Sequence, residues 1–262
     1  MILVTSLCIK NITGRKLNSQ NHNENNSKTD RRTDNENSVK ANDIAENDKT
    51  SEKAETEEND IMNEKADNIC FYYEELSEEL KSYITGKSYK ENDDISYDDL
   101  RHVVVGYIDF EGRKCIGELI VNASIAKDVT EIFKELYDNQ YQIEKIKLID
   151  EYDADDDKSM ADNNSSAFNY RVVDGTNRIS AHGYGLAIDI NPLYNPYVRT
   201  TFGERNVLPV NAVGYADRTK EFDHKIVKGD ICHNIFIRHG FNWGGDWNTP
   251  VDYQHFYKEL ER

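Results

Sequence analysis

The chain has 262 residues and carries 32 Lys and Arg against 49 Asp and Glu, a net charge of −17 at neutral pH. Residues 71–262 hold 13 of these net negative charges, which argues against nucleic acid and against an anionic membrane as partners. The length allows one large domain, or one domain with an appendage.

The first 70 residues lack the composition of a folded domain. The first aromatic residue is Phe71, every proline lies at or after Pro192, and residues 11–69 consist mainly of Asn, Lys, Asp, Glu, Ser and Thr. Such a segment cannot bury enough apolar surface to offset the conformational entropy lost on ordering. We therefore expect residues 1–70 to be a disordered polar tail or spacer, and residues 71–262 to form a single domain.

The apolar segment Met1–Lys10 is too short to span a membrane, and it lacks the basic start of a secretory signal. It fits the end of a longer signal, the stub of a membrane or wall anchor that involves Cys8, or an ordinary disordered terminus. Of the other cysteines, Cys115 and Cys232 have apolar neighbours and predict buried free thiols rather than a disulfide.

Helical and strand patterns alternate along the next 80 residues. Phe71–Ile84 has apolar residues at helical spacing and predicts an amphipathic helix. Residues 101–110 and 114–121 are rich in β-branched residues and flank the turn signal Glu111-Gly112, so they predict a β-hairpin in which His102 is structural. Residues 122–137 predict a helix with one apolar stripe, and residues 143–149 predict a further strand.

Residues 153–157 carry four acidic side chains in five positions. The stretch lacks the glycine and the terminal glutamate of an EF-hand, so we expect a solvated turn rather than a calcium loop. Arg171 follows it and has two interpretations. It forms a structural ion pair, or its guanidinium fork binds a peptide carboxylate or a developing oxyanion, which we favour.

Two stretches later in the chain offer metal ligands. His182 and Asp189 are separated by small and apolar residues, and His255 follows Asp252 by three positions. Two imidazoles and a carboxylate are a standard ligand set for a catalytic zinc, which keeps its fourth position for water. A carboxylate that is not a ligand can then take the proton of that water, and Asp252 is the candidate. The alternative is that His182 caps a turn and Asp189 ends a strand with a local hydrogen bond.

Further aromatic and histidine residues lie between or beside these stretches. His224, His233 and His239 have no familiar ligand spacing, and His239 precedes a glycine at an expected helix end, so we exclude all three from the metal site. The aromatic residues Trp243, Trp247 and Tyr253 are expected to shape a substrate groove or the core.

The pattern Ser180-x-His182-x-x-Gly185-x-Ala187-x-Asp189, followed by Asp252-x-x-His255, resembles the VanY-like D-alanyl-D-alanine carboxypeptidases, a group of zinc peptidases. This group includes L-alanyl-D-glutamate endopeptidases of bacteriophages and shares its metal-site fold with the hedgehog signalling domain. The resemblance covers about residues 76–262 and extends through residues 159–171, 191–197 and 240–247, in the expected order. Tyr257 departs from the glutamate that many relatives carry after the His-Phe pair.

The resemblance implies zinc bound by His182, Asp189 and His255, with Asp252 as general base and acid and Arg171 polarising the scissile carbonyl. It implies an α+β domain of the hedgehog/DD-peptidase type, with a small antiparallel sheet and flanking helices. The implied substrate is the stem peptide of bacterial peptidoglycan, from which a carboxypeptidase removes the terminal D-alanine. An L-alanyl-D-glutamate endopeptidase and a non-catalytic, zinc-bearing wall-binding domain are the alternatives. We expect a monomer that acts outside the cytoplasm, at the cell surface or secreted.

Overall fold

The computed structural model describes residues 69–173 and 175–259. The predicted tail falls outside these ranges except for residues 69 and 70, and so do Met1–Lys10 and Cys8. The prediction for the tail therefore stays a prediction.

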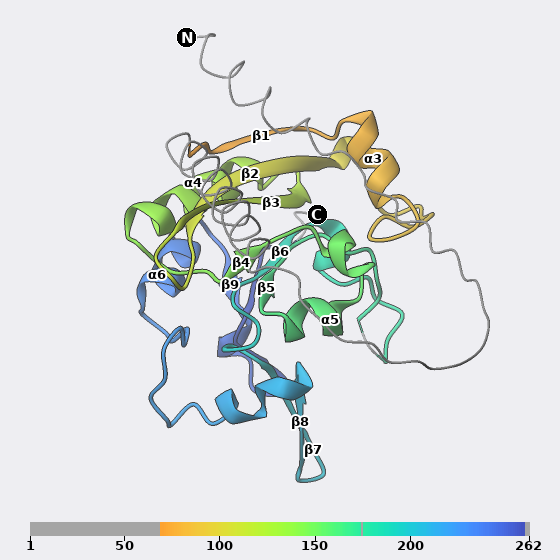
Figure 1. Ribbon diagram of the computed structural model, residues 1–262. Helices are drawn as coiled ribbons and strands as arrows, with labels where there is room; N and C mark the ends of the chain where they lie inside the picture. Colours follow the sequence, from red (N-terminus) through yellow and green to blue (C-terminus); the bar gives the residue numbers. More distant parts are fainter. Residues whose placement is uncertain (1–68, 174, 260–262) are drawn as a thin grey trace, which may run out of the picture. The chain divides into compact units, whose positions relative to one another are not determined.

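An antiparallel sheet of three strands begins the described part of the chain. It contains β1 (Tyr72–Glu75), β2 (Leu100–Ile108) and β3 (Lys114–Asn122), with β2 in the middle. Helix α4 (Ala126–Asp138) lies along this sheet, as Figure 1 shows. The predicted hairpin of residues 101–110 and 114–121 is confirmed, because β2 and β3 pair over their whole length.

The apolar stripe of α4 faces the sheet and forms the centre of the main core. Its residues Val129, Ile132, Phe133 and Leu136 are at most 1% exposed. The helix begins four residues later than predicted, since β3 continues to Asn122, whose side chain then accepts a hydrogen bond from Ser124 N.

Two of the predicted elements are wrong in part. The predicted helix Phe71–Ile84 is a strand in its first half, because β1 pairs with β2 and so satisfies its backbone groups. Its second half is α3 (Glu78–Ile84), which starts where Ser77 accepts from Leu80 N. The predicted strand 143–149 shortens to β4 (Lys145–Ile146), which pairs in parallel with β5 (Asn164–Ser165).

The remaining elements are short. They are η1 (Tyr97–Asp99), η2 (Ile149–Tyr152), α5 (Asp156–Ala161), η3 (His182–Tyr184), β6 (Ala187–Asp189), β7 (Tyr197–Thr201), β8 (Glu204–Leu208), η4 (Val210–Tyr215), α6 (Ile231–Arg238), β9 (Asn242–Trp243), η5 (Gly244–Asp246), β10 (Val251–Asp252) and β11 (His255–Tyr257). Two more antiparallel sheets have the orders β6-β11-β9 and β10-β7-β8. The fold is therefore a mixed α and β structure with small antiparallel sheets, as predicted at this level.

Other predictions for single residues can be compared with the structure. Cys115 and Cys232 are free thiols as predicted; Cys232 is buried, whereas Cys115 is only half-buried. His102 is buried in β2, with Glu74 and Glu118 on either side of its ring. Among residues 69–173 and 175–259, no helix has both the length and the apolar character needed to cross a membrane.

Candidate metal centre

Strand pairing brings two of the predicted ligands together. β6 and β11 are antiparallel, and their register sets His255 directly opposite Asp189. Both strands lie in the main core, where Ile188 and Phe256 are fully buried beside them. Residues that are 66 positions apart in the chain are therefore held side by side by backbone hydrogen bonds and by packing.

The third predicted ligand, His182, lies in the short helix η3. This helix ends at Gly185, whose φ of +67° allows the left-handed turn into β6. A side chain at Gly185 would also collide with the backbone of Asn122, because its Cβ would lie 2.7 Å from Asn122 N. His182 Nδ1 lies 2.6 Å from Ala167 O, so this nitrogen carries the proton and Nε2 keeps its lone pair for another partner.

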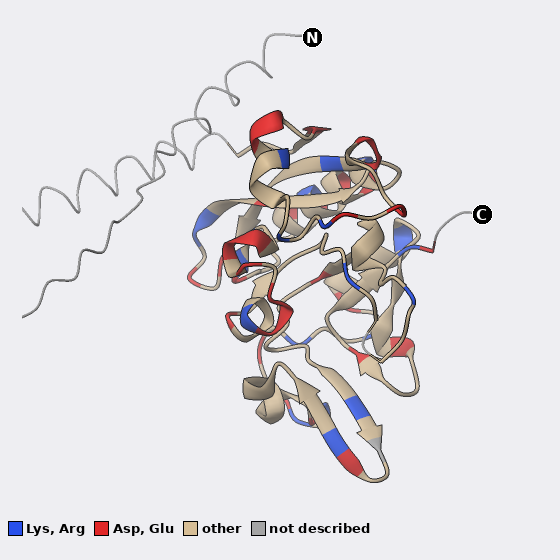
Figure 2. Cartoon of the chain, turned by 90° about the vertical axis from the view of Figure 1, so that its right-hand side faces the viewer, with Lys and Arg blue, Asp and Glu red and all other residues tan. Residues whose placement is uncertain are grey.

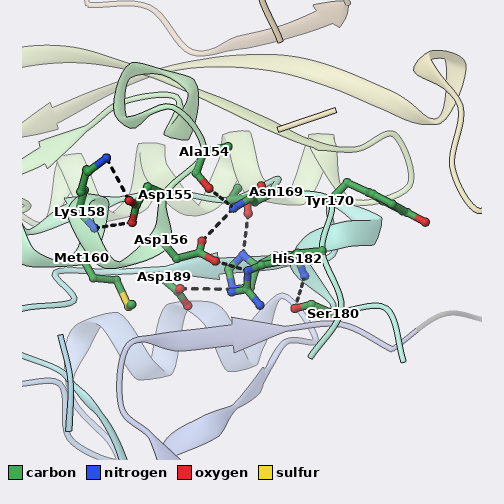
Figure 3. A network of polar contacts seen from close by, with 12 residues as sticks. Ala154, Asp155, Asp156, Lys158, Met160, Asn169, Tyr170, Ser180, His182 and Asp189 are labelled. Carbon is green, nitrogen blue, oxygen red and sulfur yellow. Dashed lines mark hydrogen bonds and ion pairs between the residues drawn. The ribbon is translucent and has the colours of Figure 1, made fainter. Parts of the chain in front are cut away.

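The three side chains converge on one point. His182 Nε2 lies 3.1 Å from His255 Nδ1 and 3.3 Å from an Asp189 oxygen, and His255 Nδ1 lies 3.1 Å from the other Asp189 oxygen. All three residues are at most 9% exposed. Figure 3 shows Asp189 and His182 facing each other. The two imidazoles and the carboxylate therefore form a buried cluster of possible metal ligands.

The charges of this group depend on one another. Burial opposes ionisation of Asp189, but His182 and His255 outweigh that effect, so the pKa of Asp189 lies well below its ordinary value. Burial likewise opposes the charged form of His182, but the Asp189 carboxylate raises the pKa of His182 overall. A buried carboxylate that is held ionised by two basic nitrogens is the electrostatic arrangement of a cation site.

Asp252 ends β10, next to this group. Its Oδ1 is buried and has no hydrogen-bond partner among residues 69–173 and 175–259. Burial, with a smaller contribution from Asp189, raises the pKa of Asp252 to about 6, although His255 opposes the shift. Gly244 permits the close packing here, because a Cβ on it would lie 2.7 Å from Asp252 O and 3.3 Å from His255 Cβ. A carboxylate with one buried oxygen that has no hydrogen-bond partner among the described residues is a candidate for proton transfer.

Arg171 lies close enough to His182 to affect its charge, and its guanidinium forms an ion pair with Asp156. The Nε of Arg171 contacts Asp156 Oδ2, and the positive charge of Arg171 lowers the pKa of His182. Asn169 donates from Nδ2 to Asp156 Oδ1 over 3.0 Å, and Figure 3 shows this contact beside His182. Arg171 therefore forms the ion pair of the first sequence interpretation and acts electrostatically on His182. Its binding of a carboxylate or a developing oxyanion stays a prediction.

Asp156 is a residue of this site that sequence reasoning missed. The acidic stretch 153–157 is more than a solvated turn, because Asp155 accepts from Lys158 N and so begins α5, in which Asp156 is the first residue. The signal available in the sequence was the pattern of an N-cap followed by acidic residues in a first helical turn. That pattern predicts the helix, but it does not predict the contact with Arg171.

The excluded histidines lie elsewhere, as expected. His224 stacks on Phe110, His233 accepts a hydrogen bond from Gly229 N, and His239 Nε2 lies 2.9 Å from Glu135. His239, Asp128 and Glu131 each have one possible metal-ligand atom, and these three atoms lie within 4.8 Å of one another. Lys258 Nζ binds Asp128 over 2.5 Å, so an ammonium group already neutralises that carboxylate.

The aromatic residues divide between the core and the candidate site. Trp243 is 5% exposed and packs on Phe256, so it belongs to the core. Trp247 packs against His255 with ring centroids 5.4 Å apart and donates from Nε1 to the hydroxyl of Tyr257. Tyr257 thus supports the aromatic wall around His255 at the position where many relatives of the resembled family carry glutamate.

The comparisons with known proteins agree with this description. A family model described as D-alanyl-D-alanine carboxypeptidase matches residues 174–258, which include His182, Asp189, Asp252 and His255 but not Arg171. The match confirms the resemblance expected from the sequence and supports a hydrolase of the peptidase class. No curated protein and no solved structure matches the chain.

Proposed function

We propose that this protein is a zinc metallopeptidase that acts on peptidoglycan stem peptides. The premise is the match of residues 174–258 to the D-alanyl-D-alanine carboxypeptidase family. The observation that carries the proposal is the buried convergence of His182, Asp189 and His255, with Asp252 beside them, whose Oδ1 has no hydrogen-bond partner among the described residues. The reaction we assign is removal of the terminal D-alanine by a D-alanyl-D-alanine carboxypeptidase.

The donor atoms fit the size of a zinc ion. Ligands at the usual zinc–nitrogen distance of about 2.0–2.1 Å in a tetrahedron lie about 3.3 Å from one another. The three donor pairs of His182, Asp189 and His255 are 3.1, 3.1 and 3.3 Å apart. Bound there, zinc polarises the scissile carbonyl and lowers the pKa of water. The contact of His182 Nδ1 with Ala167 O fixes the tautomer that this role requires.

Asp252 is the proposed general base. Its Oδ1 accepts no hydrogen bond from the described residues, so it is free to accept a proton from the attacking water. A carboxylate in this position can take a proton from the water and then give it up. Asp252 therefore passes the proton to the leaving amine, and one carboxylate serves both halves of the reaction.

Arg171 is the proposed electrophilic group. Its Nε is occupied by Asp156, so the terminal nitrogens of the guanidinium remain to donate to the scissile carbonyl oxygen. Charge that develops on this oxygen in the transition state strengthens such hydrogen bonds, and the loss of one oxyanion donor typically lowers kcat about 10²- to 10³-fold. Asp156 and Asn169 hold the guanidinium in place.

The wider organisation is part of the same proposal. Residues 71–262 form the catalytic domain with the hedgehog/DD-peptidase fold, and residues 1–70 are a polar spacer. We assign the enzyme to the exterior of a bacterial cell, as a monomer that is tethered through its N-terminal segment or secreted. The family match supports the class of substrate from which this assignment follows.

The test is mass spectrometry of a synthetic pentapeptide stem that ends in D-Ala-D-Ala, after incubation with the zinc-loaded full chain. We expect the loss of a single alanine from the C-terminus. Release of the N-terminal L-alanine would instead assign the same site to an L-alanyl-D-glutamate endopeptidase. An intact peptide with one zinc bound per chain would contradict the enzyme assignment and favour a wall-binding domain.

A further inference from the structure

A small sheet connects Asp252 to a protruding hairpin. β10 pairs with β7 so that Asp252 lies opposite Tyr197, and β7 pairs with β8 so that Tyr197 lies opposite Leu208. From this row, β7 and β8 continue outward as the hairpin, which projects from the body of the described residues in Figure 1. We call the sheet of β10, β7 and β8 the platform. Asp252, the candidate base, lies at one end of the platform, and the tip of the hairpin forms the other end.

Arg199 lies on the same face of this platform as Asp252. Residues directly opposite each other in a sheet point to one face, and so do residues two apart along a strand. Asp252, Tyr197 and Arg199 therefore share a face. The other face is the inner one, because Val198 and Val207 are buried there against η4. The face of Arg199 is open, since Arg199 and its partner Asn206 are both exposed.

The guanidinium of Arg199 has no partner within the described residues. It forms no ion pair or hydrogen bond there, although Glu204 lies one row further along the same face. Three other arginines do have partners. Arg171 forms an ion pair with Asp156, and Arg205 and Arg218 donate hydrogen bonds to backbone carbonyls. Figure 2 shows basic positions on both strands of the hairpin. An unpaired arginine in a domain with 13 net negative charges is suited to an anionic ligand.

We propose that Arg199 is a specificity-determining residue that binds the C-terminal carboxylate of the peptide substrate. This inference rests on the proposed function and deepens it. The rows of Tyr197 and Arg199 are about 6.8 Å apart, whereas the carboxylate of a single leaving residue lies about 3.5 Å beyond the scissile carbonyl, so the arginine side chain has to span only the remaining distance of about 3.5 Å. A peptide whose scissile bond lies at Asp252 and whose end runs along β7 therefore brings its terminal carboxylate within reach of the long arginine side chain. The guanidinium fork matches a carboxylate with two parallel hydrogen bonds.

The experiment compares two substrates and two variants in the zinc-loaded full chain. The substrates are the pentapeptide with a free C-terminal carboxylate and the same peptide as its C-terminal amide. We expect the wild type to show a KM about tenfold lower for the carboxylate form, and Arg199→Gln to lose this difference while its kcat changes little. Arg199→Lys should recover only part of the preference, because an ammonium group lacks the fork.

Lys114→Gln is the matched control. It removes one positive charge from an exposed residue of β3, in a different sheet, and should keep the preference for the carboxylate. Thermal unfolding should be unchanged in both glutamine variants, because both side chains are exposed. The inference fails if the wild type does not distinguish the two peptides, or if the preference survives in Arg199→Gln. If the zinc-loaded wild type cleaves neither peptide, the proposed function fails and the inference falls with it.

Discussion

Asp252→Asn should stabilise the metal-free protein while it removes activity. The substitution keeps the shape of the side chain and removes the charge of a carboxylate whose buried Oδ1 has no hydrogen-bond partner among the described residues. The pKa of this carboxyl is about 6 in the folded chain and 3.8 as its ordinary value, and one pKa unit corresponds to about 1.4 kcal/mol. Ionised Asp252 therefore lowers the free energy of unfolding by up to about 3 kcal/mol at pH 7.5.

The sign of the pH dependence follows from the raised pKa. A group with a raised pKa in the folded state does not lower the free energy of unfolding at a pH below its unfolded pKa. The loss of stability grows as the pH rises from 3.8 to about 6. The difference between Asp252→Asn and the wild type should thus shrink from about 3 kcal/mol at pH 7.5 to about 1 kcal/mol at pH 4.5. The asparagine amide has its own burial cost, so these values are upper limits.

The assay is urea unfolding of both metal-free proteins at the two pH values, followed by circular dichroism. Comparing the variant with the wild type at each pH removes the part of the titration of His182 and Asp189 that does not depend on Asp252. The reasoning is refuted if Asp252→Asn is less stable than the wild type at pH 7.5, or if its effect on stability is the same at both pH values.

Four further substitutions test the site. Asp189→Asn should weaken zinc binding at least about a hundredfold in calorimetric titration, because it removes the charged ligand; unchanged affinity would place the metal elsewhere. Arg171→Lys should lower kcat about 10²-fold, and Asp156→Asn about tenfold with KM nearly unchanged; a kcat unaffected in both would exclude Arg171 from catalysis. Gly244→Ala should destabilise the protein by about 1–3 kcal/mol in urea unfolding, since its Cβ would lie 2.7 Å from Asp252 O; an unchanged midpoint would contradict this close packing.

Local patterns predicted the parts of the fold that local forces determine. The hairpin of β2 and β3 follows from two strand patterns around Glu111-Gly112, and α4 follows from its apolar stripe. The spacing of His182 and Asp189 alone left the metal site and a structural role open, and the resemblance that favours the metal site rests on several separate blocks in the expected order. For the hairpin and for α4, the evidence lies within one short stretch of chain.

The parts that were missed depend on contacts between distant residues. Tyr72–Glu75 carries helical spacing, yet it forms a strand because the edge of β2 is available to it. The predicted strand 143–149 is observed only as Lys145–Ile146, the two residues that pair with β5, which is distant in the sequence. The ion pair between Asp156 and Arg171 joins the start of α5 to a separate loop, and no local pattern encodes which acidic residue meets the arginine.

Zinc content and peptide hydrolysis, measured on the same preparations of wild type and Asp252→Asn, test the central claim most directly. We predict one zinc per chain in both proteins and a loss of hydrolysis of at least about a hundredfold in the variant, because the ligands remain while the base is removed. Hydrolysis that survives in zinc-loaded Asp252→Asn would contradict the account.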